Sequence, residues 1–178
     1  MSVPASDQPA ANAFDIGPKV EIVFVIGPPG SGKGTHCKRL ASEAALGIYH
    51  LSAGDYLRDI SNGEVAIEEG MLGDMPYDDF RAHLEKSKLL PGPTVARILA
   101  HKVWKEYENG QRTFLIDGYP RQTDAADEFE KAVTGPRAVV EFCCERESPR
   151  SASWSAEEGT TTRRRLTGAM LSILRPLV

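Results

Sequence analysis

Residues 20–35 read Val-Glu-Ile-Val-Phe-Val-Ile-Gly-Pro-Pro-Gly-Ser-Gly-Lys-Gly-Thr. The apolar run 20–26 is typical of a buried strand, a glycine-rich turn follows at once, and a helix is expected to start near Lys33. The glycines of such a turn let successive backbone N–H groups point inward at phosphate oxygens, and the helix N-terminus adds partial positive charge. This order predicts a phosphate-binding loop, with the Lys33 ammonium against the phosphates. The alternative is a flexible loop that contains glycine and lysine by chance.

A second segment joins a short strand, expected at 48–51, to a helix. Residues 50–58 read His-Leu-Ser-Ala-Gly-Asp-Tyr-Leu-Arg. Ser52 is expected to cap the helix, with Asp55 three residues later in a capping-box arrangement. This structural role explains both residues without any function. Arg58, one turn further on, is either an ordinary surface residue or a phosphate ligand.

A third segment, residues 113–121, reads Thr-Phe-Leu-Ile-Asp-Gly-Tyr-Pro-Arg. Residues 114–116 predict a buried strand, and Asp117 then stands at its carboxyl end, where ligands bind in open parallel sheets. A carboxylate in this place can hold Mg²⁺ directly or through water, because Mg²⁺ prefers oxygen ligands and keeps several waters. The alternative role for Asp117 is to cap a helix or a turn.

Together the three segments resemble the nucleoside monophosphate kinase family, which includes the adenylate kinases and UMP-CMP kinases. The resemblance covers about residues 20–133 and rests on the Gly-Lys-Gly-Thr form of the loop and on segments 50–58 and 113–121. It implies transfer of the ATP γ-phosphoryl group to a nucleoside monophosphate, with Mg²⁺ as the cofactor of ATP. Such a reaction needs charge neutralisation, in-line positioning and exclusion of water.

The resemblance also implies roles for individual residues. Lys33, Asp117 and Arg121 are the catalytic candidates, and Asp117 is expected to hold Mg²⁺ through water, with Thr35 as a further candidate ligand. Arg58 and Arg121 match two arginines that grip the acceptor phosphate, where a planar guanidinium can bind two oxygens. The residues expected to contact ATP are Gly30, Ser31, Gly32, Lys33, Gly34 and Thr35. Those expected to contact the monophosphate are Ala53, Arg58, Lys88, Leu89, Leu90, Gly118, Tyr119, Pro120 and Arg121.

Several positions bear on the base of the acceptor. Residues 87–91 read Ser-Lys-Leu-Leu-Pro and resemble the family's Gly-Lys-Leu-Val-Pro, whose backbone contacts that base. Ala53 is similar to UMP-CMP kinases, whereas adenylate kinases more often have threonine. The carboxamide that reads the base in many members falls at Ala125 here, and the nearest amide, Gln122, has a different place on the turn. UMP or CMP is therefore favoured slightly over AMP, and both remain open.

Strands that alternate with helices predict an α/β fold with right-handed crossovers. The expected architecture is a P-loop parallel sheet with flanking helices, an inserted NMP-binding helical lid, and a C-terminal part that is degenerate or truncated. In the helix expected from Lys33 to about Ala45, the residues Cys37, Leu40, Ala41 and Ala44 share one apolar face, which predicts that this face is buried.

The chain is expected to divide into five stretches. They are a disordered tail (1–19), the P-loop core (20–58), the NMP-binding insert (59–91), the continued core (92–145) and an aberrant lid and C-terminal tail (146–178). The insert is longer than is usual in the family, and we interpret its extra carboxylates as a solvated face rather than a binding site. These carboxylates belong to Glu64, Glu68, Glu69, Asp74, Asp78 and Asp79.

From residue 146 onward the family resemblance ends. The family has a lid with several arginines here, but residues 146–178 carry no recognisable counterpart. Either the tail is a genuine divergent sequence, or it is read in a shifted frame, since Gly-Thr-Thr-Thr-Arg at 159–163 can encode the family's Asp-Asp-Asp-Glu pattern from the neighbouring frame. An arginine that stabilises transition-state charge is worth roughly 10³-fold or more in rate. A nucleotide-binding remnant without catalysis is therefore the competing hypothesis.

Composition narrows the class of protein. The 178 residues suffice for one domain with a sizeable core, and the net charge of −4 disfavours nucleic acid or an anionic membrane as partner. The three cysteines are odd in number and two are adjacent, so no secreted disulfide framework is expected. No apolar run reaches transmembrane length. A monomer in the cytoplasm is expected, with a nuclear location also open, and none of the four histidines is expected to be a base or a ligand.

Overall fold

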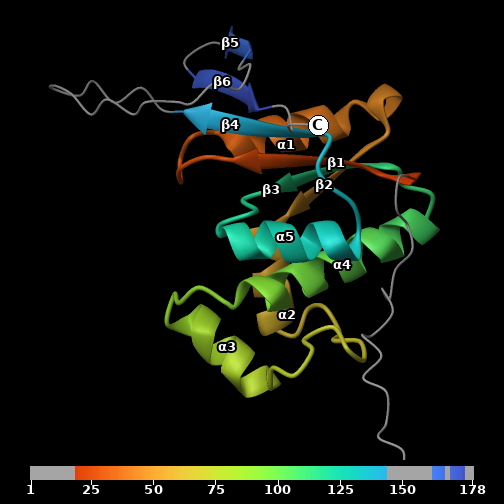
Figure 1. The fold of residues 1–178 in the computed structure, drawn as a ribbon, viewed down its shortest axis with the longest axis vertical. Coiled ribbons are helices and arrows are strands. Elements are labelled where there is room, and N and C mark those ends of the chain that lie inside the picture. The colour runs from red at the N-terminus through yellow and green to blue at the C-terminus, as the bar shows by residue number, and fades with distance from the viewer. Residues whose placement is uncertain (1–18, 144–161, 167–168, 175–178) are drawn as a thin grey trace, which may run out of the picture.

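The computed structural model describes residues 19–143, 162–166 and 169–174. The tail predicted at 1–19 therefore lies outside the described residues except for its last position, as does most of the stretch 146–178. In chain order the elements are β1 (Glu21–Ile26), α1 (Lys33–Ser42), η2 (Ala44–Leu46), β2 (Ile48–Ser52), α2 (Ala53–Ser61), α3 (Tyr77–Glu85), α4 (Gly92–Glu108), β3 (Thr113–Asp117), α5 (Thr123–Ala132), β4 (Ala138–Cys143), β5 (Thr162–Leu166) and β6 (Ala169–Leu174) (Figure 1).

One sheet holds all the described strands, in the order β2-β3-β1-β4-β6-β5. The first four are mutually parallel, which confirms the predicted parallel sheet with flanking helices. Strand β6 pairs antiparallel with β4, and β5 pairs antiparallel with β6. Because the four parallel strands end at the same edge of the sheet, the loops that follow β1, β2 and β3 meet there, and those loops carry all three motifs.

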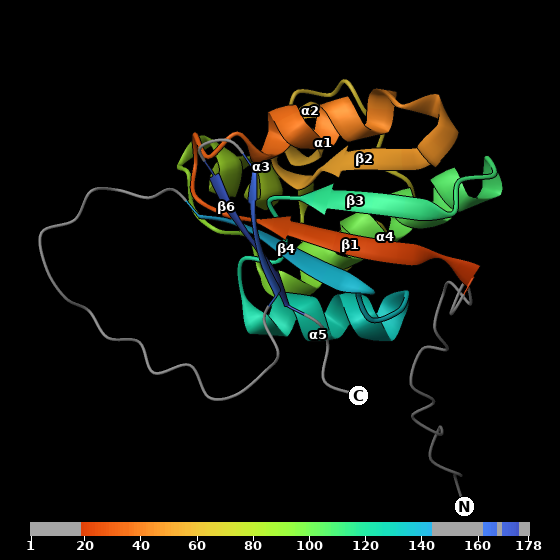
Figure 2. The same cartoon turned by 90° about the horizontal axis from the view of Figure 1, so that it is seen from above.

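Helices cover both faces of the parallel sheet, and the alternation of side chains along β1 shows how. Ile22 and Phe24 are buried in the large core cluster, which includes residues of α4 and α5, whereas Val25 is buried in a smaller cluster with Cys37 of α1. Successive strand residues point to opposite faces, so one strand supplies both cores. Seen from above, α1 lies on one side of the strands and α5 on the other (Figure 2).

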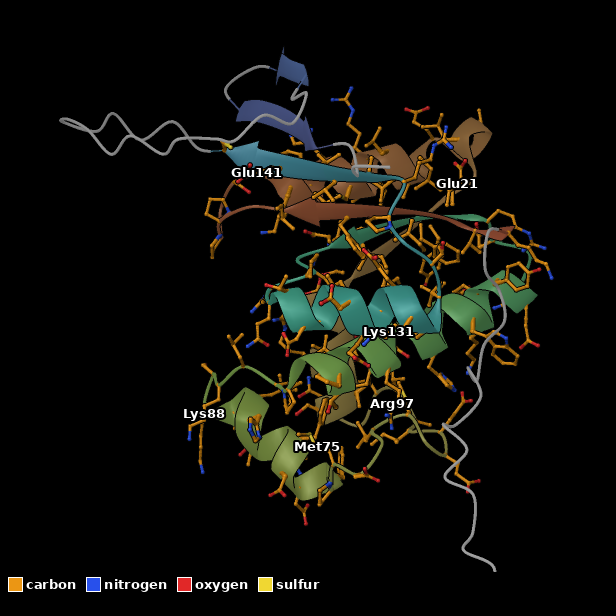
Figure 3. The ribbon with its side chains drawn as sticks, viewed as in Figure 1. Glu21, Met75, Lys88, Arg97, Lys131 and Glu141 are labelled. Carbon is orange, nitrogen blue, oxygen red and sulfur yellow. The ribbon has the colours of Figure 1, made fainter. Side chains whose placement is uncertain are left out.

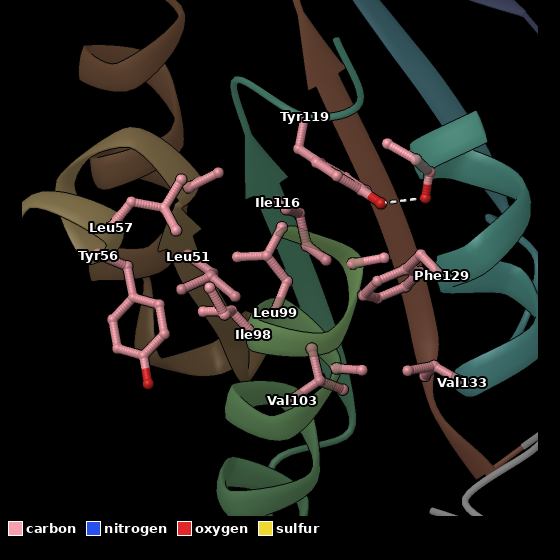
Figure 4. Packing of buried hydrophobic residues seen from close by; sticks show 14 of the residues in the cluster. Leu51, Tyr56, Leu57, Ile98, Leu99, Val103, Ile116, Tyr119, Phe129 and Val133 are labelled. Atoms are coloured by element: carbon pink, nitrogen blue, oxygen red, sulfur yellow. Dashed lines mark hydrogen bonds between the residues drawn. The ribbon is translucent and has the colours of Figure 1, made fainter. Parts of the chain in front are cut away.

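Three aromatic side chains pack together where α5 meets the sheet. The ring centroid of Phe24 lies 5.4 Å from that of Tyr119 and 5.6 Å from that of Phe129, with both pairs edge to face. The Tyr119 hydroxyl donates a hydrogen bond to the backbone carbonyl of Ala125 (Figure 4). This hydrogen bond and the ring contacts tie the residue after the Asp117-Gly118 turn to helix α5.

Helix α1 departs from the sequence prediction in its packing. Cys37 is buried, as predicted, but Leu40 is 45% exposed and Ala44 is also exposed, so the predicted buried face is wrong beyond the first turns. The helix also ends at Ser42, and a short 3₁₀ turn follows it. Among the described residues α1 contacts β2 and β3, and this contact covers only its inner side.

The insert forms α3 and a series of turns, less helical than predicted. The six carboxylates predicted to form a solvated face of the insert are all exposed, which confirms that face. Glu68 nevertheless accepts a hydrogen bond of 2.7 Å from Lys105 and lies 3.2 Å from His101, so it ties the insert to α4. Phe80 and Met71 anchor the insert from inside, and Lys88 lies at its outer end, exposed (Figure 3).

Candidate functional site

The turn after β1 has the backbone that phosphate binding requires. Gly27 passes so close to β4 that a Cβ there would lie 2.6 Å from the carbonyl oxygen of Phe142. Gly30 and Gly32 have φ angles of 77° and 81°, a left-handed conformation that favours glycine. Gly32 also caps α1 without a side-chain hydrogen bond, so no side chain blocks the N–H groups at the start of this helix. The turn can therefore present these N–H groups to an anion.

Lys33, the first residue of α1, reaches back over this loop. Its ammonium donates a hydrogen bond of 3.3 Å to the backbone carbonyl of Pro28. Ser31 is buried, and its hydroxyl has no hydrogen-bond partner among the described residues. The residues predicted to contact ATP thus follow one another from the turn into the first turn of α1, where Thr35 is exposed.

Asp117 occupies the centre of this edge of the sheet. It lies opposite Val25 on one side and opposite Ser52 on the other, because β3 pairs with both β1 and β2. The residue is only 7% exposed, and its Oδ1 atom has no hydrogen-bond partner among the described residues. Buried carboxylate oxygens are normally bonded, so an unpaired one at this edge has capacity for a cation or an ordered water.

Gly34 explains why the loop departs from the commoner Gly-Lys-Ser or Gly-Lys-Thr pattern. A Cβ on Gly34 would lie 3.2 Å from Oδ2 of Asp117, which is tighter than an ordinary van der Waals contact. The first turn of α1 therefore approaches the carboxylate as closely as its backbone allows. The hydroxyl that often follows the loop lysine comes one residue later here, at Thr35.

The helix after β2 starts as predicted. The Ser52 hydroxyl accepts a hydrogen bond of 3.4 Å from the backbone N–H of Asp55, so Ser52 is the N-cap of α2. The Asp55 carboxylate in turn pairs with the Arg58 guanidinium. The Ser52 hydroxyl, and then the guanidinium, lower the pKa of Asp55. Ser52 and Asp55 thus have structural roles, and they orient Arg58.

The two arginines predicted to bind phosphate lie around the same glycine. A Cβ at Gly54 would lie 3.5 Å from Nη1 of Arg58 and 3.9 Å from Nη2 of Arg121. Arg58 comes from α2, whereas Arg121 follows β3, so the fold brings together two cations that are far apart in the sequence. The Arg121 side chain also donates a hydrogen bond of 3.3 Å to the carbonyl of Gly118. Two guanidinium groups in this arrangement favour a multiply charged anion.

A cavity of about 320 Å³ opens beside these arginines. It is bounded by α2, the end of α3, the start of α4 and the turn between β3 and α5. Its lining residues are Ala53, Gly54, Leu57, Arg58, Leu84, Ser87, Lys88, Leu89, Leu90, Gly92, Val95, Gly118, Tyr119, Arg121, Gln122 and Ala125. Every residue predicted to contact the monophosphate is in this set except Pro120, and their binding stays a prediction.

Tyr119 and Pro120 have structural roles in this turn. They are joined by a cis peptide bond. The Tyr119 side chain is 2% exposed and its hydroxyl is bonded to Ala125, so it shapes the wall of the cavity rather than offering a polar group to a ligand. Burial, and then the nearby Asp124 carboxylate, raise the pKa of this hydroxyl.

Sequence reasoning missed part of the cavity wall. Leu57, Leu84 and Val95 line the cavity with apolar surface from three different helices. Gln122 also lines it, as the residue that precedes α5, although its place on the turn had left its role open. Helical spacing can predict that such apolar positions face inward, but it cannot show that they border an open space.

Among the helices that the structure describes, none combines the length and the apolar content needed to span a bilayer.

Comparison of the sequence with known proteins identifies relatives of this chain. Residues 25–152 match the family model described as adenylate kinase. The chain is 36% identical to adenylate kinase isoenzyme 1 of Caenorhabditis elegans over 123 residues, which are 69% of this chain and 53% of that protein. It is 33% identical to uridylate kinase of Schizosaccharomyces pombe over 127 residues, 71% of this chain and 62% of that protein. It is 36% identical to UMP-CMP kinase of Lentinula edodes over 133 residues, 70% of this chain and 54% of that protein.

The matches cover only part of each relative. The aligned part spans little more than half of the length of the curated relatives, from 53% of the C. elegans protein to 62% of the S. pombe protein. The family match begins within β1 and includes all the residues that line the cavity.

Proposed function

This chain belongs to the adenylate kinase family of nucleoside monophosphate kinases, and we propose that it transfers the γ-phosphoryl group of ATP to a nucleoside monophosphate with Mg²⁺. The placement of Asp117 is the observation that carries the proposal. This carboxylate lies in register with Val25, which leads into the phosphate-binding loop, and with Ser52, which starts the helix that bears Arg58. One buried acidic group thus separates a donor-phosphate site from an acceptor-phosphate site.

On the donor side, the backbone N–H groups of residues 30–35 hold the phosphates of ATP. The Lys33 ammonium moves from the Pro28 carbonyl to the phosphate oxygens, where it neutralises the charge of the transferred group. Backbone donors fixed by the fold do not have to reorganise during the reaction, which is why such cradles are effective.

The residues present fit a magnesium ion. Asp117 offers a buried carboxylate oxygen without a partner among the described residues, and Thr35 offers an exposed hydroxyl on the adjoining helix turn. These are the oxygen ligands that Mg²⁺ takes, directly or through its waters. A bound ion held by these residues would supply positive charge that neutralises the phosphates of ATP.

On the acceptor side, Arg58 and Arg121 hold the α-phosphate of the monophosphate. Their guanidinium groups lie around Gly54, at the mouth of the cavity. The base then occupies the cavity, between the apolar side chains of Leu57 and Val95 and the segment 87–90. Closure of the insert over this site excludes water from the transfer.

For the acceptor we propose UMP or CMP in preference to AMP. Ala53 and Ala125 are both buried in the cavity wall, and neither has a polar side-chain group for the base. Gln122 is the side-chain amide that lines the cavity, and a carboxamide can donate to and accept from the edge of a base, so the preference for UMP or CMP rests on Ala53. The amide is therefore our candidate for reading the base.

A nucleotide-binding protein without catalysis is the second candidate. The observation that favours it lies in the sequence, because residues 146–178 show no counterpart of the family's lid arginines. Loss of such an arginine reduces phosphoryl transfer by roughly 10³-fold or more while the binding groups persist.

The deciding experiment measures nucleoside diphosphate formation by the full 178-residue chain, with Mg-ATP and UMP, CMP or AMP supplied separately. Transfer that falls at least about 100-fold in Lys33→Met supports the kinase proposal, since the loss of one charge-stabilising group typically costs this much. Lys38→Met is the matched control, because Lys38 is exposed on the same helix. Absence of transfer with every acceptor, in a folded sample that binds ATP, would favour the second candidate.

A further inference from the structure

We propose that Cys37, His50 and Asp117 form a second metal site, which takes a thiophilic divalent cation such as Zn²⁺ or Co²⁺. The Cys37 sulfur, an imidazole nitrogen of His50 and a carboxylate oxygen of Asp117 all lie within 4.8 Å of one another. The three residues come from α1, β2 and β3. This site shares Asp117 with the proposed magnesium site. Its other two ligands, Cys37 and His50, belong to this site alone.

The sheet explains how residues so far apart in sequence meet. His50 lies opposite Leu115 in the parallel β2–β3 ladder, and Asp117 is two residues beyond Leu115 on the same face. Leu115 packs in the same small cluster as Cys37, so this face is the one that α1 covers. The imidazole and the carboxylate therefore point towards the inner side of α1, where the Cys37 thiol lies.

The polar atoms of this cluster have unused bonding capacity. The side chains of His50 and Asp117 are each only 9% exposed, and their closest atoms, Nε2 and Oδ2, are 3.6 Å apart. This distance is too long for a hydrogen bond. Both His50 Nε2 and Asp117 Oδ1 lack a hydrogen-bond partner among the described residues. Because buried polar groups are normally bonded, these atoms indicate a ligand that lies between them.

The donor set selects the class of metal. Thiolate and imidazole ligands favour Zn²⁺ and Co²⁺, whereas Mg²⁺ takes oxygen ligands. One thiolate and one carboxylate carry two negative charges, which balance a divalent ion and leave the buried complex neutral. Binding releases the Cys37 proton to solvent, since only the thiolate is a ligand. Burial and the Asp117 carboxylate raise the pKa of Cys37 to about 12, so only a strongly thiophilic ion displaces this proton.

One pair of ligand atoms already has nearly the spacing of a bound ion. Zinc–nitrogen and zinc–oxygen bonds of about 2.0–2.1 Å put two such atoms of a tetrahedral site roughly 3.3–3.4 Å apart, and the His50–Asp117 separation is 3.6 Å. The three ligand atoms lie within 4.8 Å of one another, so the Cys37 side chain closes the site by a small movement towards the other two. The Lys33 ammonium is near enough to lower the pKa of Cys37, so it favours the thiolate while it opposes the added cation.

A metal ion in this site is expected to inhibit phosphoryl transfer, an expectation that rests on the proposed function. A metal held by Cys37 and His50 withdraws Asp117 from Mg-ATP. Zn²⁺ is therefore expected to inhibit phosphoryl transfer when Mg²⁺ is in excess. Metal binding itself does not depend on any activity of the chain, so the two claims are tested separately.

The first experiment measures Co²⁺ binding by absorption, because thiolate-to-Co²⁺ charge transfer gives a near-ultraviolet band that carboxylates and imidazoles do not produce. The full chain is used with Cys143→Ser and Cys144→Ser, which leaves Cys37 as its one thiol. We expect a band that saturates at one Co²⁺ per chain. Adding His50→Gln should weaken the affinity at least about 10-fold, since even groups that only support ligands cost 10–100-fold.

The reciprocal variant, Cys37→Ser with Cys143 and Cys144 intact, should lose the band that saturates at one Co²⁺ per chain while its circular dichroism spectrum stays native. The proposal is overturned if the single-thiol chain is folded and shows no band, or if His50→Gln leaves the Co²⁺ affinity of that chain unchanged. The second experiment compares Zn²⁺ inhibition of transfer in the wild-type chain and in Cys37→Ser. Inhibition that Cys37→Ser reduces at least 10-fold supports the shared role of Asp117, and equal inhibition of the two chains refutes it.

Discussion

Gly34 and Asp117 pack closely across the edge of the sheet, so that a side chain on Gly34 would crowd the carboxylate. A Cβ on Gly34 would lie 3.2 Å from the Asp117 Oδ2 atom. Gly34 does not have a positive φ angle, so its backbone would accept any residue and only this contact requires glycine. The relationship fixes the distance between the start of α1 and the carboxylate that we propose holds Mg²⁺.

Gly34→Ala tests this contact. Overpacking of a close contact typically costs about 1–3 kcal/mol, so we expect kcat/KM for phosphoryl transfer to fall about 5- to 100-fold as Asp117 is displaced. Steady-state kinetics with varied Mg-ATP measure the effect. Arg39→Ala, an exposed position on the same helix, is the control and should leave kcat/KM unchanged.

Arg58→Met and Arg121→Met test the acceptor-phosphate site. Hydrogen bonds to charged groups contribute about 1.5–3 kcal/mol, so each variant should lower kcat/KM for the monophosphate about 10- to 100-fold. The KM for ATP should change little, because both arginines lie around Gly54 and not at the loop. Arg81→Met, whose guanidinium pairs with Glu85 on α3, is the matched control. Equal losses in all three variants would contradict the assignment.

Gln122→Ala tests the reading of the base. A neutral hydrogen bond contributes about 0.5–1.5 kcal/mol, so we expect kcat/KM for the preferred acceptor to fall about 2- to 10-fold. The ratio of UMP or CMP to AMP turnover should move towards one, because the lost amide contact is specific to the base. Gln111→Ala, outside the cavity, serves as control. An unchanged acceptor ratio would assign the selectivity to other residues of the wall.

Tyr119→Phe separates structure from binding in the cavity wall. The variant keeps the ring that packs on Phe24 and loses the hydrogen bond to the Ala125 carbonyl. We expect the free energy of unfolding to fall by about 0.5–1.5 kcal/mol, the net contribution of one hydrogen bond, because the Ala125 carbonyl still lies within the hydrogen-bonded helix α5. Urea unfolding measures this change. The KM for the monophosphate should stay within about twofold of wild type, because the Tyr119 hydroxyl offers no polar group to the ligand. A twofold ratio corresponds to about 0.4 kcal/mol.

Asp55→Asn tests the pH dependence of the α2 cap. The folded-state pKa of Asp55 is lowered, so its charged form stabilises the native state at neutral pH. That contribution is present above the ordinary value of 3.8 and is lost as the pH falls through the lower folded-state pKa. The stability difference between wild type and Asp55→Asn, measured by urea unfolding, should therefore be larger at pH 7 than at pH 3. An equal stability difference at the two pH values would contradict the stabilising role of the Asp55 charge.

The sequence was sufficient wherever the signal was local. The start of α1 at Lys33 and the N-cap at Ser52 follow from residues within one helical turn, and both are confirmed. The end of β3 at Asp117 follows from an apolar run that stops at a carboxylate, and it is also confirmed. Parallel pairing of the first four strands followed from their alternation with helices.

Features that depend on a third element could not be predicted in this way. Leu40 has the spacing of a buried residue, but its burial depends on what covers the outer side of α1. His50 had no assigned role, because its proximity to Asp117 arises from strand pairing and not from sequence spacing. Gln122 differs in sequence position from the family's base-reading carboxamide, yet it lines the cavity together with residues of α2, because the turn between β3 and α5 forms part of the wall.

The contact between Gly27 and Phe142 also offers a way to observe the site. A Cβ on Gly27 would lie 2.6 Å from the Phe142 carbonyl oxygen, so the loop packs directly against the end of β4, where Cys143 is partly exposed. A fluorescent dye coupled to Cys143, in a chain with Cys144→Ser and with Cys37 protected by its burial, would act as an optical reporter of the loop. Titration with ATP would then change its emission without a coupled enzyme assay, which makes the strand end a place to build a nucleotide sensor.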